Sequence, residues 1–402
     1  MRFTRWNRPR SALAVADGWN GLKNFVVLTV RNSAGQVVLT KPVTFCPDSF
    51  DQERVSPGSP PASPYPNVCT FDPFQKGMVW GIQKGWADDP TEGPFRPVKL
   101  PLGSYRMTES ISPDYTRLLR IPARDATATV NVKVVKPHCC PLPGCCGQGG
   151  ARRTGKPRSL PRGPAVRTMT SPPRSALPDL VPLPAWSIRV SHPRRQARDY
   201  LDFAATVWIG GHGPLDVQGF RSDGSPVMKA WQYFWQDGHV IGRVRAGTMS
   251  FDSQKGHNHW HFEQFARYTL LNAAQTVAVT SHKVGFCIAP SDPVDLLLPH
   301  ATWQPSQVGL QGQCGLPTAL WVAEELPLGW GDTYFQSVAG QSFDITHVPN
   351  GTYYVQVTAN PEKVLYETST RNDVSLRKVI LGGTPGHRTV KVPAWHGIDP
   401  EP

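Results

Sequence analysis

Proline and glycine interrupt this chain so often that long helices are disfavoured over most of it. The 402 residues include 41 Pro and 36 Gly, and both residue types favour turns between short segments. Hydrophobic residues make up 39% of the chain, which is enough to form a real core. We therefore expect an all-β protein of two or three domains, built from many short strands.

The positive charge of the chain is concentrated in one stretch. The formal net charge is +12, and residues 151–200, with eleven Lys or Arg and two Asp, carry +9 of it. A basic, Pro-rich segment binds polyanions only loosely, through counterion release and without sequence readout. We expect a solvated linker here and no specific nucleic-acid partner. Because no run of about 18 apolar residues occurs, we also expect no membrane span.

The eight cysteines form an early pair, a central cluster and a late pair. An even count with well-spaced pairs favours an oxidising compartment, so we predict a secreted protein with the bonds Cys46–Cys69 and Cys287–Cys314. The cluster at 139–146 either binds a soft metal or is disordered or locally bridged. The N-terminus has several Arg followed by an apolar run too short for a signal peptide. One hypothesis is therefore that an upstream segment is missing from the sequence.

Three regions follow one another along the chain. Residues 17–136 are predicted to form a small β-sandwich-like domain of unknown role, because segments with β-branched and alternating residues are separated by turns. Residues 137–182 form a Pro/Gly/Arg-rich linker with few large apolar side chains, for which we expect disorder. Residues 183–385 are predicted to form a larger β-sandwich domain. Its strand candidates are 203–209, 228–234, 257–265, 282–288, 353–358 and 375–381.

Three histidines at alternate positions, His257, His259 and His261, are the sharpest local signal. Alternate side chains of an extended segment share one face, so three imidazoles lie together. Such nitrogen donors suit Cu(II), while Zn, Fe and Ni stay open. In a flat strand the outer two histidines would lie about 13 Å apart, at about 3.3 Å per residue. The strand must therefore bulge, which Gly256 permits, or one histidine leaves the set. The alternative is a surface cluster without a metal.

The same histidines also fit the first half of a cupin metal motif. His257, His259 and Glu263 have its spacing, and this interpretation predicts an iron or manganese enzyme. The motif requires a Gly seven residues after the Glu, however, and position 270 is Leu. No clear second cupin motif is present, which leaves this alternative weakly supported.

Five motifs over about residues 200–382 resemble, in order, those of the lysyl oxidase family, in a bacterial-type member. The segment HNHWHFEQFARYTLL (257–271) is similar to the family's copper segment, and SHKVGFC (281–287) is similar to its HK-x-x-FC segment. The sequence DTY (332–334) follows. The last two similarities are the FDIT strand with its turn (343–361) and the E…N pattern (367–372). Five motifs in the family's order are much more specific than any one of them.

The resemblance implies a copper-dependent amine oxidase. It implies His257, His259 and His261 as copper ligands. It also implies a lysine tyrosylquinone cofactor made from Lys283 and Tyr334, without an external organic cofactor. The implied reaction deaminates primary amines, including lysyl side chains of proteins, to aldehydes. Molecular oxygen is the oxidant, and hydrogen peroxide and ammonia are released.

Asp332 is our candidate for the base that removes the α-proton of the substrate. It stands two residues before Tyr334 and therefore shares its face in an extended segment. The alternative is that Asp332 only opens a turn.

Departures from the animal enzymes keep a non-catalytic alternative open. Arg267 stands where those enzymes have His, and the segment 289–330 is expanded. The chain also has fewer cysteines in the catalytic region than they have. A metal-binding adhesion or scaffold module would keep the fold and the histidines but form no quinone.

Overall fold

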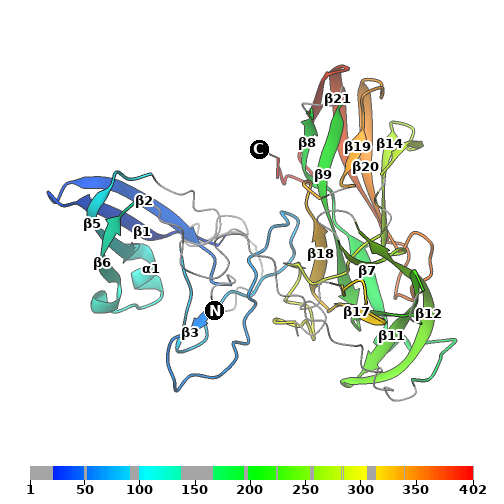
Figure 1. Ribbon diagram of the computed structural model, residues 1–402, viewed down its shortest axis with the longest axis horizontal. Helices are drawn as coiled ribbons and strands as arrows, with labels where there is room; N and C mark the ends of the chain where they lie inside the picture. The colour runs from blue at the N-terminus through cyan, green and yellow to red at the C-terminus, as the bar shows by residue number, and fades with distance from the viewer. Residues whose placement is uncertain are drawn as a thin grey trace. The chain divides into compact units, whose positions relative to one another are not determined.

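The chain is nearly all β, as the sequence predicts. The computed structural model describes residues 21–48, 52–90, 99–136, 166–193, 198–222, 225–253, 258–281, 283, 285–305, 314–338 and 340–401. Helices among them are limited to α1 (Pro113–Leu118) and the 3-10 turns η1 (Ala123–Asp125) and η2 (Arg174–Ala176). None of these described helices has the length and apolar character needed to cross a bilayer. Two compact units form, one from residues 1–63 and 80–161, the other from 64–79 and 162–402 (Figure 1).

The first unit is built on one antiparallel sheet of order β2-β1-β5-β6. Its strands are β1 (Leu22–Asn32), β2 (Val37–Phe45), β5 (Gly103–Ile111) and β6 (Thr127–Val134), and β3 (Glu53–Arg54) pairs with β4 (Trp86–Ala87). Alternate residues of β1, among them Leu28 and Val30, point into a small core with Tyr105. The β1–β2 turn closes because Asn32 Oδ1 accepts the amides of Ala34 and Gln36.

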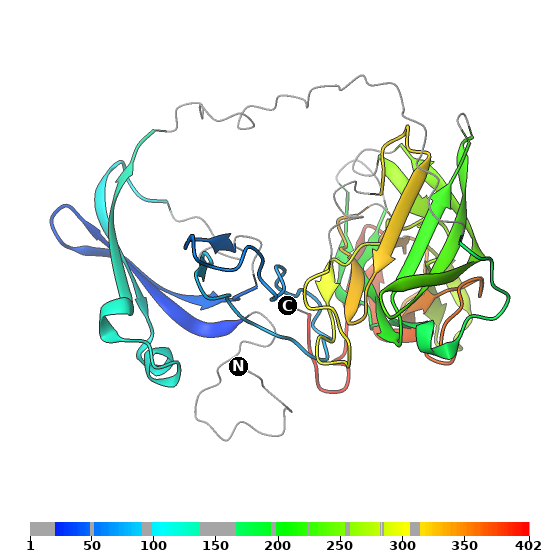
Figure 2. The ribbon, with the colours of Figure 1, turned by 90° about the horizontal axis from the view of Figure 1, so that it is seen from below.

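The second unit contains three larger sheets (Figures 1 and 2). The first has the order β13-β12-β11-β10-β17, the second β15-β14-β20-β21-β22 and the third β16-β18-β9-β19, with β7 and β8 also paired to β9. The strands are β7 (Pro178–Pro182), β8 (Trp186–Ser191), β9 (Tyr200–Gly211), β10 (Leu215–Phe220), β11 (Val227–Gln236), β12 (His239–Asp252), β13 (His259–Phe262), β14 (Ala266–Asn272), β15 (Val277–Thr280), β16 (Asp292–Pro293), β17 (Trp321–Leu326), β18 (Trp330–Tyr334), β19 (Ser342–Asp344), β20 (Gly351–Ala359), β21 (Val374–Thr384) and β22 (His387–Lys391).

One large core joins these three sheets. Its aromatic centre includes Phe203 of β9, Tyr268 of β14 and Phe343 of β19, and the Phe203 ring lies 5.3 Å and 4.9 Å from the other two. Burying such side chains contributes about 1.5–3 kcal/mol each. β9 is buried along almost its whole length, as expected for a strand made mostly of consecutive apolar residues.

Most of the predicted strands of this unit are confirmed, and one is wrong. Segments 203–209, 228–234, 353–358 and 375–381 lie within β9, β11, β20 and β21. Segment 257–265 contains the shorter β13. The described part of 282–288 forms no strand, only an isolated bridge in which Phe286 exchanges both backbone hydrogen bonds with Phe262.

The last part of the predicted linker is structured. Residues 137–165 lie outside the described residues, but 178–182 form β7, which pairs with β9. Pro178, Leu180 and Pro182 are buried on one face of β7. The prolines are tolerated because β7 pairs with β9 on one side and needs no donor from them on the other. Pro-rich composition alone therefore misled the prediction of disorder here.

Residues 64–79, which we call the strap, belong to the second unit although their sequence neighbours belong to the first. The amides of Lys76 and Gly77 donate to the carbonyl oxygen of Val294, and the Leu296 amide donates to the Gly77 carbonyl. Phe74 of the strap is buried with Leu183, Trp208 and Val294 in a small second core. The strap therefore covers part of the sheet that contains β18.

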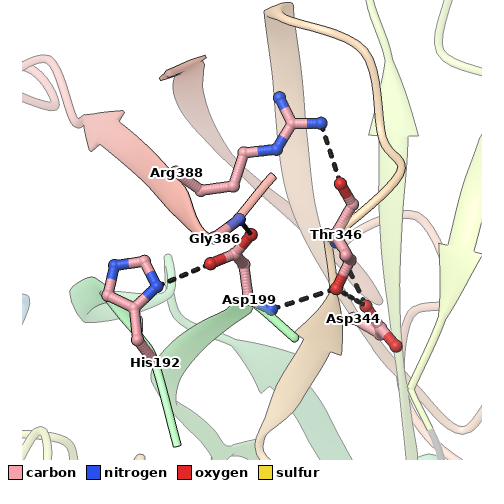
Figure 3. A network of polar contacts seen from close by, with 6 residues as sticks. All are labelled: His192, Asp199, Asp344, Thr346, Gly386 and Arg388. Atoms are coloured by element: carbon pink, nitrogen blue, oxygen red, sulfur yellow. Dashed lines mark hydrogen bonds and ion pairs between the residues drawn. The ribbon is translucent and has the colours of Figure 1, made fainter. Parts of the chain in front are cut away.

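A buried carboxylate fastens the start of β9 to its surroundings (Figure 3). Asp199 accepts the Gly386 amide at 2.7 Å and lies 2.5 Å from His192 Nδ1. Its own amide donates to Thr346 Oγ1 at 3.0 Å. These hydrogen bonds lower the pKa of Asp199 even though burial opposes them. The network therefore holds Asp199 in its charged form.

Candidate active site

β18 presents Asp332 and Tyr334 on the same face, as the spacing of the two residues predicts. The strand lies between β16 and β9, and its residues Asp332 and Tyr334 are opposite Val207 and Ala205 of β9. Asp332 is 4% exposed. A strand hydrogen-bonded on both sides is a rigid support for side chains whose positions must be fixed.

The amine of Lys283 lies against the ring of Tyr334. Its Nζ is 4.3 Å from the Tyr334 ring centroid and 5.0 Å from that of Phe286. Lys283 is only 6% exposed, and this burial lowers its pKa to about 8, against the opposing effect of Asp332 and Asp252. The structure thus brings together two residues that are far apart in the sequence, and it makes the neutral amine accessible near neutral pH.

The Tyr334 phenol is fixed by its surroundings. Its hydroxyl donates to the Cys287 carbonyl at 3.0 Å, and the Phe286 ring packs edge-on against it at 5.2 Å. The Gln341 side-chain amide donates to the Tyr334 carbonyl at 3.1 Å. Burial raises the pKa of Tyr334 well above its usual value, and the carboxyl groups of Asp332 and Glu324 add to this. The ring is therefore a neutral phenol, held in one orientation.

Two buried carboxyl groups accompany this pair, and sequence reasoning found only one of them. Asp332 accepts the Ala289 amide, and burial raises its pKa well above the usual value although Lys283 lowers it. Glu324 of β17 accepts the Ile288 amide at 3.0 Å and is 1% exposed. Its pKa is also raised, chiefly by burial. An acid at an inward position of the apolar β17 was the signal that could have revealed Glu324.

Each of these carboxyl groups keeps one oxygen available. Asp332 Oδ2 and Glu324 Oε1 are buried without a hydrogen-bond partner among the described residues. Leaving a buried polar atom unpaired is costly, so such atoms tend to mark places where a ligand, a proton or a water is accepted. Asp332 Oδ2 is thus suited to accept a proton beside the Lys283–Tyr334 pair.

Two of the three predicted metal ligands lie together on β13. The imidazole rings of His259 and His261 have centroids 4.7 Å apart, and Asp252 of β12 lies opposite His259 on the same face. The third predicted ligand, His257, lies outside the described residues. Sequence reasoning did not find Asp252.

The imidazole of His261 is packed between a carboxylate and a glycine. Its Nδ1 lies 3.8 Å from Asp252 Oδ2, and a Cβ placed on Gly285 would come within 3.2 Å of the same nitrogen. The Nδ1 nitrogen of His261 therefore faces Asp252 and Gly285. Two imidazoles supply nitrogen donors of the kind that suits copper, and a neighbouring carboxylate commonly orients such a histidine. The described residues alone contain no group of three or more His, Cys, Asp or Glu placed to hold a metal ion.

The Cys287–Cys314 disulfide joins the two halves of the site, and its predicted pairing is confirmed. Cys287 supplies the carbonyl that accepts the Tyr334 hydroxyl. The Cys314 carbonyl accepts the amide of Trp260, which lies between the two β13 histidines. Cys46 and Cys69 are also disulfide-bonded. The central cysteine cluster lies outside the described residues.

Glu263 does not support the cupin interpretation. Its carboxylate accepts a hydrogen bond of 2.7 Å from Thr248 Oγ1, and its backbone amide donates to the Thr248 carbonyl. In a cupin-type site this carboxylate would ligate the metal together with the histidines. Here it serves instead to close the end of β13 onto β12.

Comparisons with known proteins concern the same region. Residues 226–387 match the protein-family profile described as Lysyl oxidase. Lysyl oxidase homolog 2 of Xenopus tropicalis is 28% identical over 140 residues, which are 34% of this chain and 16% of the relative. Its namesakes in Gallus gallus and Homo sapiens are 30% and 29% identical over 119 residues, 29% of this chain and 13% of each relative. The match thus spans only 13–16% of the length of these relatives.

Proposed function

Since this chain belongs to the lysyl oxidase family through residues 226–387, we propose that it is a copper-dependent amine oxidase. The observation that carries the proposal is the buried Lys283 amine against the Tyr334 ring, with Asp332 on the same strand. His259 and His261, with His257 as the third ligand, would hold the copper. The proposed reaction converts primary amines, with lysyl side chains of proteins as one substrate class, to aldehydes.

Lys283 and Tyr334 are the proposed source of the lysine tyrosylquinone cofactor. When bound, copper supplies redox chemistry with molecular oxygen, and the quinone supplies an electrophilic carbonyl that primary amines attack. The burial that lowers the Lys283 pKa to about 8 leaves its nitrogen lone pair available for bonding to the adjacent ring. The hydrogen bond from the Tyr334 hydroxyl to Cys287 fixes the ring, over which this nitrogen lies at 4.3 Å from the centroid.

Asp332 is the proposed general base. Its Oδ2 would take the proton from the carbon next to the substrate nitrogen, while the Ala289 amide holds the carboxyl group in place. Burial strengthens the basicity of this carboxylate, because the charged form is poorly solvated. Hydrogen peroxide and ammonia would leave as products. The disulfide bonds favour an extracellular setting for this reaction.

The proposal is tested by amine-dependent peroxide release from copper-loaded protein. We expect turnover with a primary amine such as benzylamine or a lysine-containing peptide, and we expect phenylhydrazine to block it by trapping the quinone. Lys283→Arg is expected to abolish both the phenylhydrazine adduct and peroxide release while copper binding remains. Lys378→Arg, on the exposed side of β21, is the matched control and should match the wild type.

Two outcomes would decide against the proposal. Copper binding without phenylhydrazine-reactive absorbance in the wild type would favour the metal-binding module. Retained turnover in Lys283→Arg would exclude Lys283 as part of the cofactor. An intact-mass measurement distinguishes these cases independently, because cross-linking and ring oxidation both change the mass of the chain.

A further inference from the structure

The strap reaches the active-site strand through a buried side chain, Asp292. This carboxylate is fully buried in β16. From the strap it accepts the Thr70 hydroxyl at 2.8 Å, the Phe71 amide at 3.2 Å and the Asp72 amide at 3.0 Å. It also accepts the hydroxyl of Thr333 at 3.1 Å. Three bonds from the strap and one from β18 therefore converge on the same two oxygens.

Thr333 stands between the two proposed catalytic residues of β18. Because side chains alternate along a strand, it faces away from Asp332 and Tyr334 and contacts the opposite side of the sheet. There its hydroxyl also lies 2.8 Å from Thr206 Oγ1 of β9, and its amide donates to Ser291 Oγ at 2.8 Å. The register of β18 is thus fixed from the side opposite the Lys283–Tyr334 contact.

The strap itself is held too firmly for an incidental surface contact. Phe74 lies 4% exposed, with its ring 5.2 Å from that of Trp395. Lys76 Nζ stacks 4.4 Å over the Trp208 ring. Asp72 is fully buried and accepts the Phe74 amide at 2.7 Å, which closes the turn that presents the strap amides to Asp292. A shift of the strap would therefore also move the three donors that hold the Asp292 carboxylate.

From these contacts we infer that Asp292 is a positioning residue for the Asp332–Tyr334 strand, and that the strap, through Asp292, is a working part of the oxidising centre. The catalytic part of the inference rests on the proposed function. The mechanical part, that the strap restrains β18, does not. A segment that the sequence assigns to the N-terminal region thereby acquires a role in the chemistry of the C-terminal unit.

Removing the charge at position 292 tests the inference in the full-length protein. Asp292→Asn keeps the size of the side chain but replaces an acceptor oxygen by an NH₂ group, so one pair of the four donors loses its acceptor. We expect amide hydrogen exchange in peptides covering 330–335 to rise by about tenfold or more, since hydrogen bonds to charged groups are the strong ones. Asp295→Asn removes a half-buried carboxyl three residues later, whose Oδ1 accepts the Leu297 amide rather than a donor of β18. It is the matched control and should leave this exchange unchanged.

Quinone content and steady-state kinetics give the second readout. We expect Asp292→Asn to lower phenylhydrazine-reactive quinone and kcat by about tenfold with KM unchanged, because the altered group contacts β18 from behind and touches no substrate. If the wild type itself forms no quinone, the proposed function fails, and the exchange measurement still decides whether the strap restrains β18.

A milder variant guards against loss of folding. Thr333→Val removes the bond from β18 to Asp292, together with the contact between the same hydroxyl and Thr206, and leaves the three strap bonds intact. It is expected to raise exchange over 330–335 in the same direction. Exchange equal to that of the wild type in both variants would overturn the inference. Full quinone yield and kcat in Asp292→Asn would overturn its catalytic part even if exchange rises.

Discussion

The amine of Lys283 lies where water solvates its charge poorly, and this explains its unusual acidity. Burial lowers its pKa to about 8, and the neighbouring carboxyl groups offset only part of this effect. The neutral amine is the form that can bond to the Tyr334 ring. Lys283 therefore lies beside Tyr334 and can adopt the neutral form that reacts, and the residue type alone predicts neither property.

Cofactor formation should consequently depend on pH in a defined direction. Lys283 loses its proton as the pH rises through about 8, so the nucleophilic form accumulates above that value. We expect the rate of quinone appearance, after copper is added to copper-free protein in oxygenated buffer, to rise between pH 6.5 and 9 with a midpoint near 8. A rate that is flat over this range would contradict the assignment of Lys283 as the nucleophile.

Asp252 is the residue that connects the two halves of the site electrostatically. It lies 3.8 Å from His261 Nδ1 and also acts on the Lys283 amine. We predict that Asp252→Asn weakens copper binding by about 10–100-fold, the range found when the polar partner of a metal-ligating side chain is changed. Competition with a chelator of known affinity measures this loss. Asp237→Asn, in the exposed β11–β12 turn, should bind copper as the wild type does.

At the scale of elements, β7 is the clearest case of tertiary context overriding composition. It comes from a Pro-rich stretch, yet Leu180 is fully buried in the main core and β7 pairs along β9. We predict that Leu180→Ala destabilises the second unit by about 2–5 kcal/mol, the usual cost of emptying a buried leucine site. Denaturant unfolding followed by tryptophan fluorescence checks this.

A surface substitution supplies the comparison for Leu180→Ala. Val374→Ala removes an apolar side chain that is 50% exposed on β21, so it should change the free energy of unfolding by no more than about 0.5 kcal/mol. Equal effects of the two substitutions would mean that β7 does not belong to the core.

Across the part of the molecule that the structure describes, acids whose pKa is raised by burial outnumber acids whose pKa is lowered. Burial raises the pKa of Asp72 and Asp216 to about 7 and that of Asp292 to about 6. In each case the folded state binds the proton more readily than the unfolded state, so their contribution to stability falls as the pH rises from about 4 to 7. The pKa of Asp199 is lowered instead, so its contribution to stability is present near neutral pH and is lost only at lower pH.

The direction of this pH dependence of stability can be measured with one variant. Asp216→Asn removes the titrating group from a buried site that is 3% exposed and faces Trp235 and Gln218. Lowering the pH from 7.5 to 5 stabilises the wild type through protonation of Asp216, and the variant lacks this contribution. We therefore expect the melting temperature at pH 5, relative to that at pH 7.5, to be lower in the variant than in the wild type. Other groups titrate in both proteins, so the difference isolates Asp216. Equal changes would show that Asp216 does not take up a proton in this range.

Local sequence patterns were sufficient to predict the all-β class, most strands of the second unit and the Cys287–Cys314 pairing. Period-two alternation and apolar runs such as β9 are local properties, and turn residues separate them. The sequence also singled out Lys283, Tyr334 and Asp332 through short motifs in a fixed order. Their proximity could not follow from local patterns, because the residues lie on different segments.

The groups that surround those residues became known only from the packing of the folded chain. Glu324 and Asp252 reach the site through sheet pairing, and the strap reaches it across 220 sequence positions through the Asp72 amide on Asp292. Long-range pairing places backbone amides and carboxylates opposite each other only after the sheets have formed. The composition of a segment predicts its local conformation. Its burial, and the pKa shifts that burial causes, depend on which other segments pack against it.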